Sequence, residues 1–313
     1  MNIGILTSIY NDLPLEQTLQ KLHARGVRHA EIPAGGVLEK HHCDPDELLS
    51  DASKLDAFRE KFQTYDITID ALSCHVNPIH PVAETARENV RQLRQAVLLA
   101  EALGVPVVNT FSGCAGEPGG KYPNWIVQPW PFDFLELADW QWNEVLIPFW
   151  RSFMPFAQEH RVKIALEMHP GFMCYNPETL LRLCNAVQNP FLGCNFDPSN
   201  LAWQGADMPA AVRALSGRIF HCHAKDVALI EENARINGRL DAKHYVHAQS
   251  RRQWLFRTVG RGHGEDFWIE LVRALFVSGY DGVLSIEHED PFLSADDGID
   301  AAVAFLRKVL AEA

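Results

Sequence analysis

The chain has 313 residues, of which 47% are hydrophobic and 22% charged, a composition typical of a folded globular protein rather than a disordered or fibrous one. Lysine and arginine number 28 against 40 aspartates and glutamates, so the formal charge at pH 7 is −12. A surface this acidic repels phosphate backbones, and we expect no nucleic-acid partner. No stretch approaches the roughly 18 consecutive apolar residues of a membrane span and no apolar leader is evident, so we expect a cytoplasmic protein without membrane contact.

Eight short apolar runs alternate with helical patterns along the chain. Leucines at helical spacing, such as Leu15, Leu19 and Leu22, predict the intervening helices, and a closing helix is expected over 295–311. This order predicts an α/β fold with one (β/α)8 TIM barrel spanning residues 1–313. The competing open doubly wound sheet is disfavoured because no glycine-rich phosphate turn follows the first run. The predicted strands are 2–8, 29–36, 68–76, 105–113, 163–171, 192–199, 219–226 and 282–290.

Two connections are much longer than the usual two to six residues. They are residues 112–145, rich in Gly, Pro and Trp, and residues 227–265, and they follow predicted strands 4 and 7. Because both follow parallel strands, we expect both to overhang the same mouth of the barrel. Trp125 in the first connection, and Trp203 after the sixth strand, are expected to offer aromatic faces to a substrate, with simple packing as the alternative.

Polar side chains follow the apolar parts of the last four predicted strands. Residues two apart in a strand share a face, so each strand end can be inspected for what it presents to the barrel interior. Three carboxylates and one imidazole on successive strands suit a divalent cation such as Mn²⁺, Mg²⁺ or Co²⁺, with room for two substrate oxygens. Taken singly, each residue could be a polar cap, but the set favours a metal site. Its members are Glu167, Asp197, His223 and Glu287.

Four segments resemble one known family. They are EMHPGFMCYNPETLLRL, NFDPSNLAWQG, FHCHAKD and GYDGVLSIEHEDP, and the resemblance extends from SCHVNPIHP in the third strand to the C-terminus. They are similar to the sugar phosphate isomerase/epimerase group of the xylose isomerase-like TIM barrels, in the AP endonuclease 2 superfamily. That superfamily also holds endonuclease IV, inosose dehydratase, ketose 3-epimerases and the catalytic subunits of C-glycoside deglycosidases. The motifs specify the superfamily strongly and the substrate weakly.

The resemblance implies that the same four residues hold a divalent metal. It also implies that Glu167 and Glu287 act as the acid/base pair, exchanging a proton on either face of a metal-bound enediolate. One departure is informative: many relatives have DPSH where this chain has DPSN, so Asn200 replaces a histidine and cannot act as a base. Asn200, together with Asn109 at the end of the fourth strand, also removes two histidines that a zinc-dependent nuclease would need.

Further residues are candidates for substrate contact. His169 is a second base or a substrate contact, with a structural histidine as the alternative. Lys225 would polarise a substrate oxygen, or pair with a carboxylate. His75, Asn109 and Asn200 are expected to hydrogen-bond substrate hydroxyls.

The leading functional hypothesis is a metal-dependent isomerase or epimerase that abstracts a proton α to a carbonyl of a keto sugar or cyclitol-like substrate. A second hypothesis is a lyase on 3-oxo-glycosides, in which the same enediolate expels a substituent by β-elimination. A third is a barrel that binds a sugar or a partner without catalysis. In each case a carbohydrate is the expected ligand, and a homo-oligomer or a small partner subunit is compatible with the exposed aromatic residues.

Overall fold

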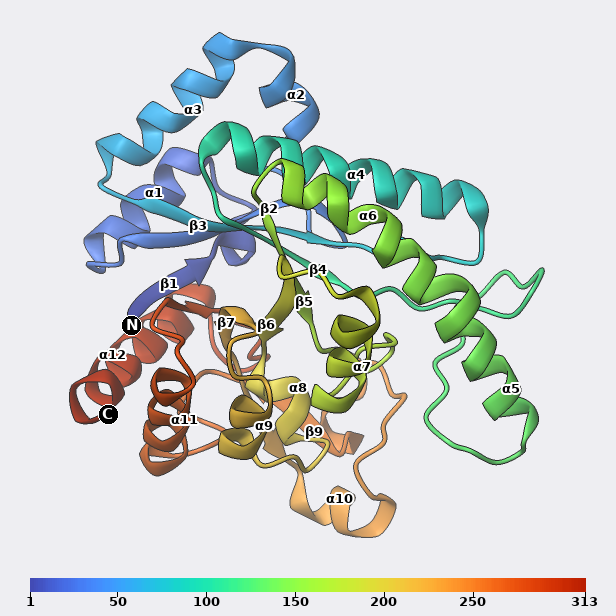
Figure 1. Cartoon of the computed structure of the whole chain (residues 1–313). Coiled ribbons are helices and arrows are strands. Elements are labelled where there is room, and N and C mark those ends of the chain that lie inside the picture. The colour runs from blue at the N-terminus through green and yellow to red at the C-terminus, as the bar shows by residue number, and fades with distance from the viewer.

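Eight parallel strands close into a ring in the computed structural model, which describes residues 1–313 (Figure 1). Their order around the ring is β1-β10-β7-β6-β5-β4-β3-β2, so the predicted (β/α)8 barrel is confirmed. Each predicted run contains one barrel strand. The strands are β1 (Asn2–Leu6), β2 (His29–Gly36), β3 (Thr68–His75), β4 (Val107–Phe111), β5 (Lys163–Glu167), β6 (Leu192–Phe196), β7 (Ile219–Ala224) and β10 (Val283–Ile286).

Helices surround the barrel, and their apolar faces meet it (Figure 1). A contiguous cluster of 67 buried side chains joins the strands and the helices into one core. None of the helices combines the length and apolarity needed to cross a membrane. The helices are α1 (Leu15–Ala24), α2 (Pro45–Ser50), α3 (Ala52–Thr64), α4 (Ala83–Leu103), α5 (Asp133–Trp140), α6 (Ile147–Glu159), α7 (Pro177–Val187), α8 (Pro198–Ala202), α9 (Met208–Ala214), α10 (Glu231–Asn237), α11 (Glu265–Val277) and α12 (Ala295–Glu312).

Several strands end earlier than their sequence patterns predict. The sixth predicted run extends to residue 199, but β6 ends at Phe196 because Asp197 begins helix α8. The Asp197 carboxylate accepts hydrogen bonds from the Ser199 backbone N–H at 2.7 Å and from the Ser199 hydroxyl at 2.7 Å, as an N-cap residue does. The polar residues at this strand end therefore form the barrel mouth instead of continuing the ladder.

The connection after β7 contains a hairpin that the sequence did not predict. Strand β8 (Asp226–Leu229) pairs antiparallel with β9 (Trp254–Arg257), and the GRGHGED turn follows. The Asp226 carboxylate accepts the backbone N–H groups of Gly262 and His263 at 3.1 and 3.0 Å. A Cβ at Gly262 would lie 2.3 Å from the Val227 carbonyl oxygen, so this close approach requires glycine.

The connection after β4 includes a long helical segment. Helix α5, a π-helical turn over residues 141–146 and helix α6 form one continuous helical segment, and α5 extends beyond the barrel (Figure 1). The Trp150 indole N–H in α6 donates to the Ser112 carbonyl at 2.9 Å, which anchors the start of the connection. Trp142 is buried, with the Arg182 guanidinium 4.1 Å from its ring centroid.

At the amino-terminal end of the strands, Asp70 of β3 pairs with His29 of β2, with 2.9 Å between Oδ1 and Nδ1. Burial raises the pKa of Asp70 from 3.8 to about 6, against the opposing effect of His29. The folded protein therefore binds more protons than the unfolded chain between these pH values. We expect the free energy of unfolding to fall as the pH rises from about 4 to about 6, by at most about 3 kcal/mol from this group.

Denaturant unfolding of the wild type and Asp70→Asn at several pH values measures this contribution. The asparagine variant should show a flatter pH dependence over the same interval. Parallel curves for the two proteins would contradict the assignment to Asp70.

Candidate metal centre at the barrel mouth

Side chains from the carboxyl ends of β5, β6, β7 and β10 meet at one point. Each of Glu167, Asp197, His223 and Glu287 contributes a ligand-type atom, and these four atoms lie within 4.8 Å of one another. The four strands are consecutive in the ring, so Glu167 and Glu287 are the outer members of the series. The structure thus brings together the four residues that the sequence analysis selected.

Asp197 and Asn200 connect the helix cap to this cluster. While Asp197 Oδ1 caps helix α8, its Oδ2 accepts a hydrogen bond from the Asn200 amide at 2.8 Å. The same amide donates to Glu167 Oε1 at 3.0 Å. Burial raises the pKa of Asp197 to about 7, and the nearby carboxylates Glu167 and Glu287 add to this effect while Lys225 opposes it. Asn200 therefore positions two carboxylates by hydrogen bonds.

Glu167 is buried at the end of β5 beside two histidines. Its Oε2 lies 2.8 Å from His75 Nε2 and 3.6 Å from His223 Nδ1. Burial opposes its ionisation, but His75 and His223 together lower the pKa of Glu167 below its ordinary value. Glu167 is consequently ionised at neutral pH and able to accept a proton.

Glu287 lies on the other side of the cluster, against Lys225. Its Oε1 is 3.0 Å from Lys225 Nζ, and its Oε2 is 2.9 Å from His223 Nδ1. Burial opposes ionisation, but Lys225 and His223 lower the pKa of Glu287 well below its ordinary value. Lys225 also lies 3.1 Å from Glu289. The sequence left open an ion pair for Lys225, and the structure shows one with each of these two glutamates.

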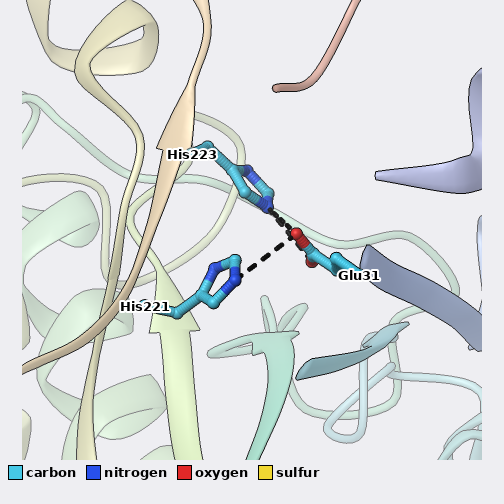
Figure 2. Close-up of side chains that lie close together, drawn as sticks. All are labelled: Glu31, His221 and His223. Atoms are coloured by element: carbon cyan, nitrogen blue, oxygen red, sulfur yellow. Dashed lines mark hydrogen bonds and ion pairs between the residues drawn. The ribbon is translucent and has the colours of Figure 1, made fainter. Parts of the chain in front are cut away.

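Beneath the cluster lies Glu31 of β2, which sequence reasoning missed (Figure 2). It is 1% exposed and accepts hydrogen bonds from the Ser285 hydroxyl and the Asn109 amide, both at 2.7 Å, and from the Ser73 hydroxyl. His223 Nε2 lies 3.1 Å from Glu31 Oε2. Burial alone would raise the pKa of Glu31, but His223, together with neighbouring donors, holds it well below its ordinary value. A single acidic residue within the apolar run HAEIPAGG was the available signal.

A cavity of about 620 Å³ opens above the cluster. Its polar lining residues are His75, Glu167, His169, Lys225, Gln249, Glu287, His288, Glu289 and Asp290. Its outer wall is largely apolar, formed by Ile9, Val37, Leu38, Tyr245, Val246, Leu255, Phe256, Pro291 and Leu293. Of the two long connections, only 227–265 contributes lining residues to this cavity, while 112–145 lines separate hollows.

His169 has one free ring nitrogen. Its Nδ1 lies 2.6 Å from the Pro170 carbonyl oxygen, which can only accept, so Nδ1 carries the hydrogen. Burial lowers the pKa of His169, and the ring is neutral at pH 7. Nε2 therefore keeps its lone pair, as a proton acceptor or substrate contact requires.

Four predicted substrate contacts, Asn109, Asn200, Trp125 and Trp203, do not line this cavity. The Asn200 amide instead donates to Glu167 and Asp197. Asn109 is fully buried under the cluster, where its amide also lies 3.0 Å from His221 Nδ1. Trp125 and Trp203 line a separate hollow, and Trp203 stacks on Trp254 with 4.8 Å between ring centroids. Trp203 is buried by this stacking, which agrees with the packing alternative.

The donor set fits a divalent cation. Three carboxylates and one imidazole within 4.8 Å match the ligand preference of Mn²⁺ and similar ions, whose bonds to oxygen and nitrogen are about 2.1 Å long. Glu287 Oε2 is buried, and although His223 Nδ1 lies 2.9 Å away, no well-aligned donor satisfies this oxygen. A buried carboxylate oxygen without a donor is costly unless a cation or water satisfies it.

Replacing Asn200 with alanine tests the support it gives to the cluster. We expect Asn200→Ala to lower Mn²⁺ affinity by about 10- to 100-fold, because Glu167 and Asp197 each lose a hydrogen bond that orients them. Isothermal titration calorimetry measures the affinity. Gln204→Ala is the matched control, since the Gln204 amide donates to backbone carbonyls of the same region and contacts neither carboxylate. Wild-type affinity in Asn200→Ala would contradict the prediction.

Comparisons with known proteins agree on one fold. The family model described as xylose isomerase-like TIM barrel matches residues 19–309. The protein YfiH of Bacillus subtilis (strain 168) is 35% identical over 316 residues, covering 100% of both chains.

Two solved structures share the whole architecture. The IOLI protein with a binding zinc atom is 20% identical, with a TM-score of 0.69 over 100% of this chain and 99% of the other. An L-ribulose 3-epimerase is 16% identical, with a TM-score of 0.68 over 100% of this chain and 95% of the other. At these identities the two likenesses establish the fold alone. Together with the family match, the closed barrel identifies the chain as a member of the xylose isomerase-like TIM barrel family.

Proposed function

We propose that the protein is a divalent-metal-dependent enzyme that removes a proton α to a carbonyl of a keto sugar or cyclitol-like substrate, leading to isomerisation or epimerisation. Glu167, Asp197, His223 and Glu287 would hold the metal, with Mn²⁺ as the first choice and Mg²⁺ or Co²⁺ as alternatives. The fold shared with an L-ribulose 3-epimerase and a zinc-binding protein supports this assignment.

One observation carries the proposal: only two of the four cluster residues line the cavity. Glu167 and Glu287 face the substrate space, whereas Asp197 and His223 lie behind them, each 0% exposed. The two accessible carboxylates come from the outer strands of the four, β5 and β10, and so flank whatever enters between them. This is the arrangement that proton removal from one face and return to another requires.

Both glutamates are ionised and can therefore act as bases. Neighbouring His75 and Lys225 keep them ionised, and contacts on each side restrict their orientation. A divalent cation at the cluster supplies positive charge that stabilises negative charge developing on substrate oxygens, which lowers the barrier to losing the α proton. Glu167 or Glu287 then accepts that proton. The other carboxylate first takes up a proton from solvent and then donates it at the opposite face.

Polar neighbours would orient the substrate. Lys225 and His169 both line the cavity beside the glutamates, and His169 Nε2 is free of hydrogen bonds to the protein. An ammonium group donates to a substrate oxygen, and a neutral imidazole accepts from a hydroxyl. These contacts would select a polyhydroxylated substrate and hold its α carbon near the carboxylates.

A lyase acting on 3-oxo-glycosides is the second candidate. The observation that favours it is the apolar outer wall, in which Val37 and Val246 are 73% and 65% exposed. A free monosaccharide has little apolar surface to cover such a wall, whereas an aromatic aglycone does. Proton removal by the same carboxylates would then be followed by β-elimination of the aglycone.

Deuterium uptake from D₂O tests the leading proposal. Purified protein is incubated with Mn²⁺ and a panel of keto sugars, ketoinositols and 3-oxo-glucosides, and exchange at the α carbon is followed by NMR. Exchange with a ketose or ketoinositol supports isomerisation, and release of a chromophoric aglycone from a 3-oxo-glucoside identifies the lyase. A protein that binds neither Mn²⁺ nor Co²⁺ would instead be a non-catalytic binding barrel.

A further inference from the structure

We propose that Glu31 is a positioning residue that holds the His223 imidazole by its Nε2–H and so directs Nδ1, with its lone pair, toward the metal cluster. The inference rests on the metal centre of the proposed function and adds a residue from β2 that is not among the four ligands (Figure 2).

The two nitrogens of His223 face opposite sides. Nδ1 lies 2.9 Å from Glu287 Oε2, on the side of the cluster. Nε2 lies 3.2 and 3.1 Å from the two oxygens of Glu31. The ring is 0% exposed, so neither nitrogen can form a hydrogen bond with bulk water. The imidazole is therefore held between the Glu31 carboxylate and the cluster.

The neighbours of Glu31 determine which nitrogen carries the hydrogen. Asn109 and Ser285 donate to its two oxygens at 2.7 Å, and Ser73 donates as well, so the carboxylate acts only as an acceptor. Nε2 must then be the donor, which leaves Nδ1 as the ligand atom. The Asn195 amide lies 3.1 Å from the same Nε2 and can present its oxygen there, because its oxygen and nitrogen exchange places by rotation.

Glu31, His221 and His223 also have the composition of a metal site, with ligand-type atoms within 4.8 Å. Three considerations argue against a second ion there. The oxygens of Glu31 already accept from three protein side chains, and a metal at His223 Nε2 would require the one imidazole to bridge two cations. His221 Nε2, 3.7 Å from Glu31 Oε2, lies beyond hydrogen-bond range of the carboxylate. The hydrogen-bonded arrangement satisfies Glu31 without an ion.

Metal binding by Glu31→Gln tests the proposal. The amide is isosteric, but it lacks the charge, and one of its two heteroatoms is a donor that conflicts with the donors around it. We expect Co²⁺ and Mn²⁺ affinities to fall by about 10- to 100-fold in calorimetric titrations, and the visible absorption of the Co²⁺-loaded protein to change because His223 ligates in an altered orientation. Glu31→Asp, which keeps the charge at a shorter reach, should recover part of the affinity.

Asp70→Asn is the matched control, since it alters a carboxylate–histidine pair between the same strands β2 and β3 at the opposite end of the barrel. It should keep wild-type affinity and spectrum. If Glu31→Gln does not fold, Ser285→Ala, which removes one donor to the carboxylate, should still weaken Co²⁺ binding severalfold.

Three outcomes would overturn the inference. If Glu31→Gln keeps the wild-type affinity and spectrum, the carboxylate does not position His223. The same conclusion follows from wild-type behaviour of Ser285→Ala if Glu31→Gln does not fold. Two ions in the wild type, with one lost in Glu31→Gln, would make Glu31 a ligand. If the wild type binds neither Co²⁺ nor Mn²⁺, the proposed metal centre itself is wrong, and the role of Glu31 falls with it. In the first two outcomes the wild type still binds metal, and only the role of Glu31 is wrong.

Discussion

Replacing Glu287 with glutamine is expected to lower the rate of α-proton exchange by about 10²- to 10⁴-fold, the usual contribution of a positioned general base or acid. The amide occupies the same volume beside Lys225 and His223 but cannot accept the substrate proton. The rate is measured as deuterium incorporation from D₂O with saturating Mn²⁺, so that weaker metal binding is compensated.

Glu289→Gln is the matched control for this experiment. Both glutamates contact Lys225, with distances of 3.0 Å for Glu287 and 3.1 Å for Glu289, but only Glu287 belongs to the metal cluster. We expect the Glu289 variant to keep Mn²⁺ affinity and to lose far less of the exchange rate. Exchange at the wild-type rate in Glu287→Gln would remove Glu287 from the acid/base pair.

Removal of divalent cations is expected to abolish exchange and to destabilise the fold. Without a cation, three carboxylates crowd one buried site, and burial holds the Asp197 pKa at about 7. A ligand that binds only the folded state at 1,000 times its dissociation constant adds about 4 kcal/mol to the free energy of unfolding. Thermal and denaturant unfolding with EDTA, and after adding back Mn²⁺, measure this difference.

The stabilisation should depend on the cluster itself. Asp197→Asn removes one of the three carboxylates, and we expect added Mn²⁺ to raise its unfolding temperature much less than that of the wild type. Equal shifts in the two proteins would place the bound metal elsewhere. No shift in the wild type at millimolar Mn²⁺ would contradict a metal centre in this barrel.

Much of the fold was predictable because each strand and helix carries its own signal. Apolar runs such as NIGIL and KIALE alternate with segments whose apolar residues have helical spacing. Few compact folds besides a barrel accommodate such an alternation of strands and helices. The cluster was predictable for a related reason: in a closed parallel barrel, every strand ends at the same mouth. Glu167, Asp197, His223 and Glu287 could therefore be grouped without knowing any distance.

The lining of the cavity was not predictable in the same way. Trp125 was expected to contact substrate, but the connection that carries it lines a separate hollow with Tyr175 and Trp203. Tyr245 and Phe256 lie in the other long connection and do line the cavity, because the β8–β9 hairpin folds that segment over the mouth. Long loops contain few periodic signals, so their paths depend on contacts distant in sequence.

The sequence by itself thus determined the barrel, the strand ends that face its mouth and the membership of the four-residue cluster, since these follow from local periodicity and parallel topology. Only the tertiary structure decided which members of the cluster are accessible, which connection walls the cavity, and that Glu31 lies against His223. Glu31 and His223 are 192 residues apart in the chain. Contacts of this kind arise when the ring of strands closes, and no local pattern encodes them.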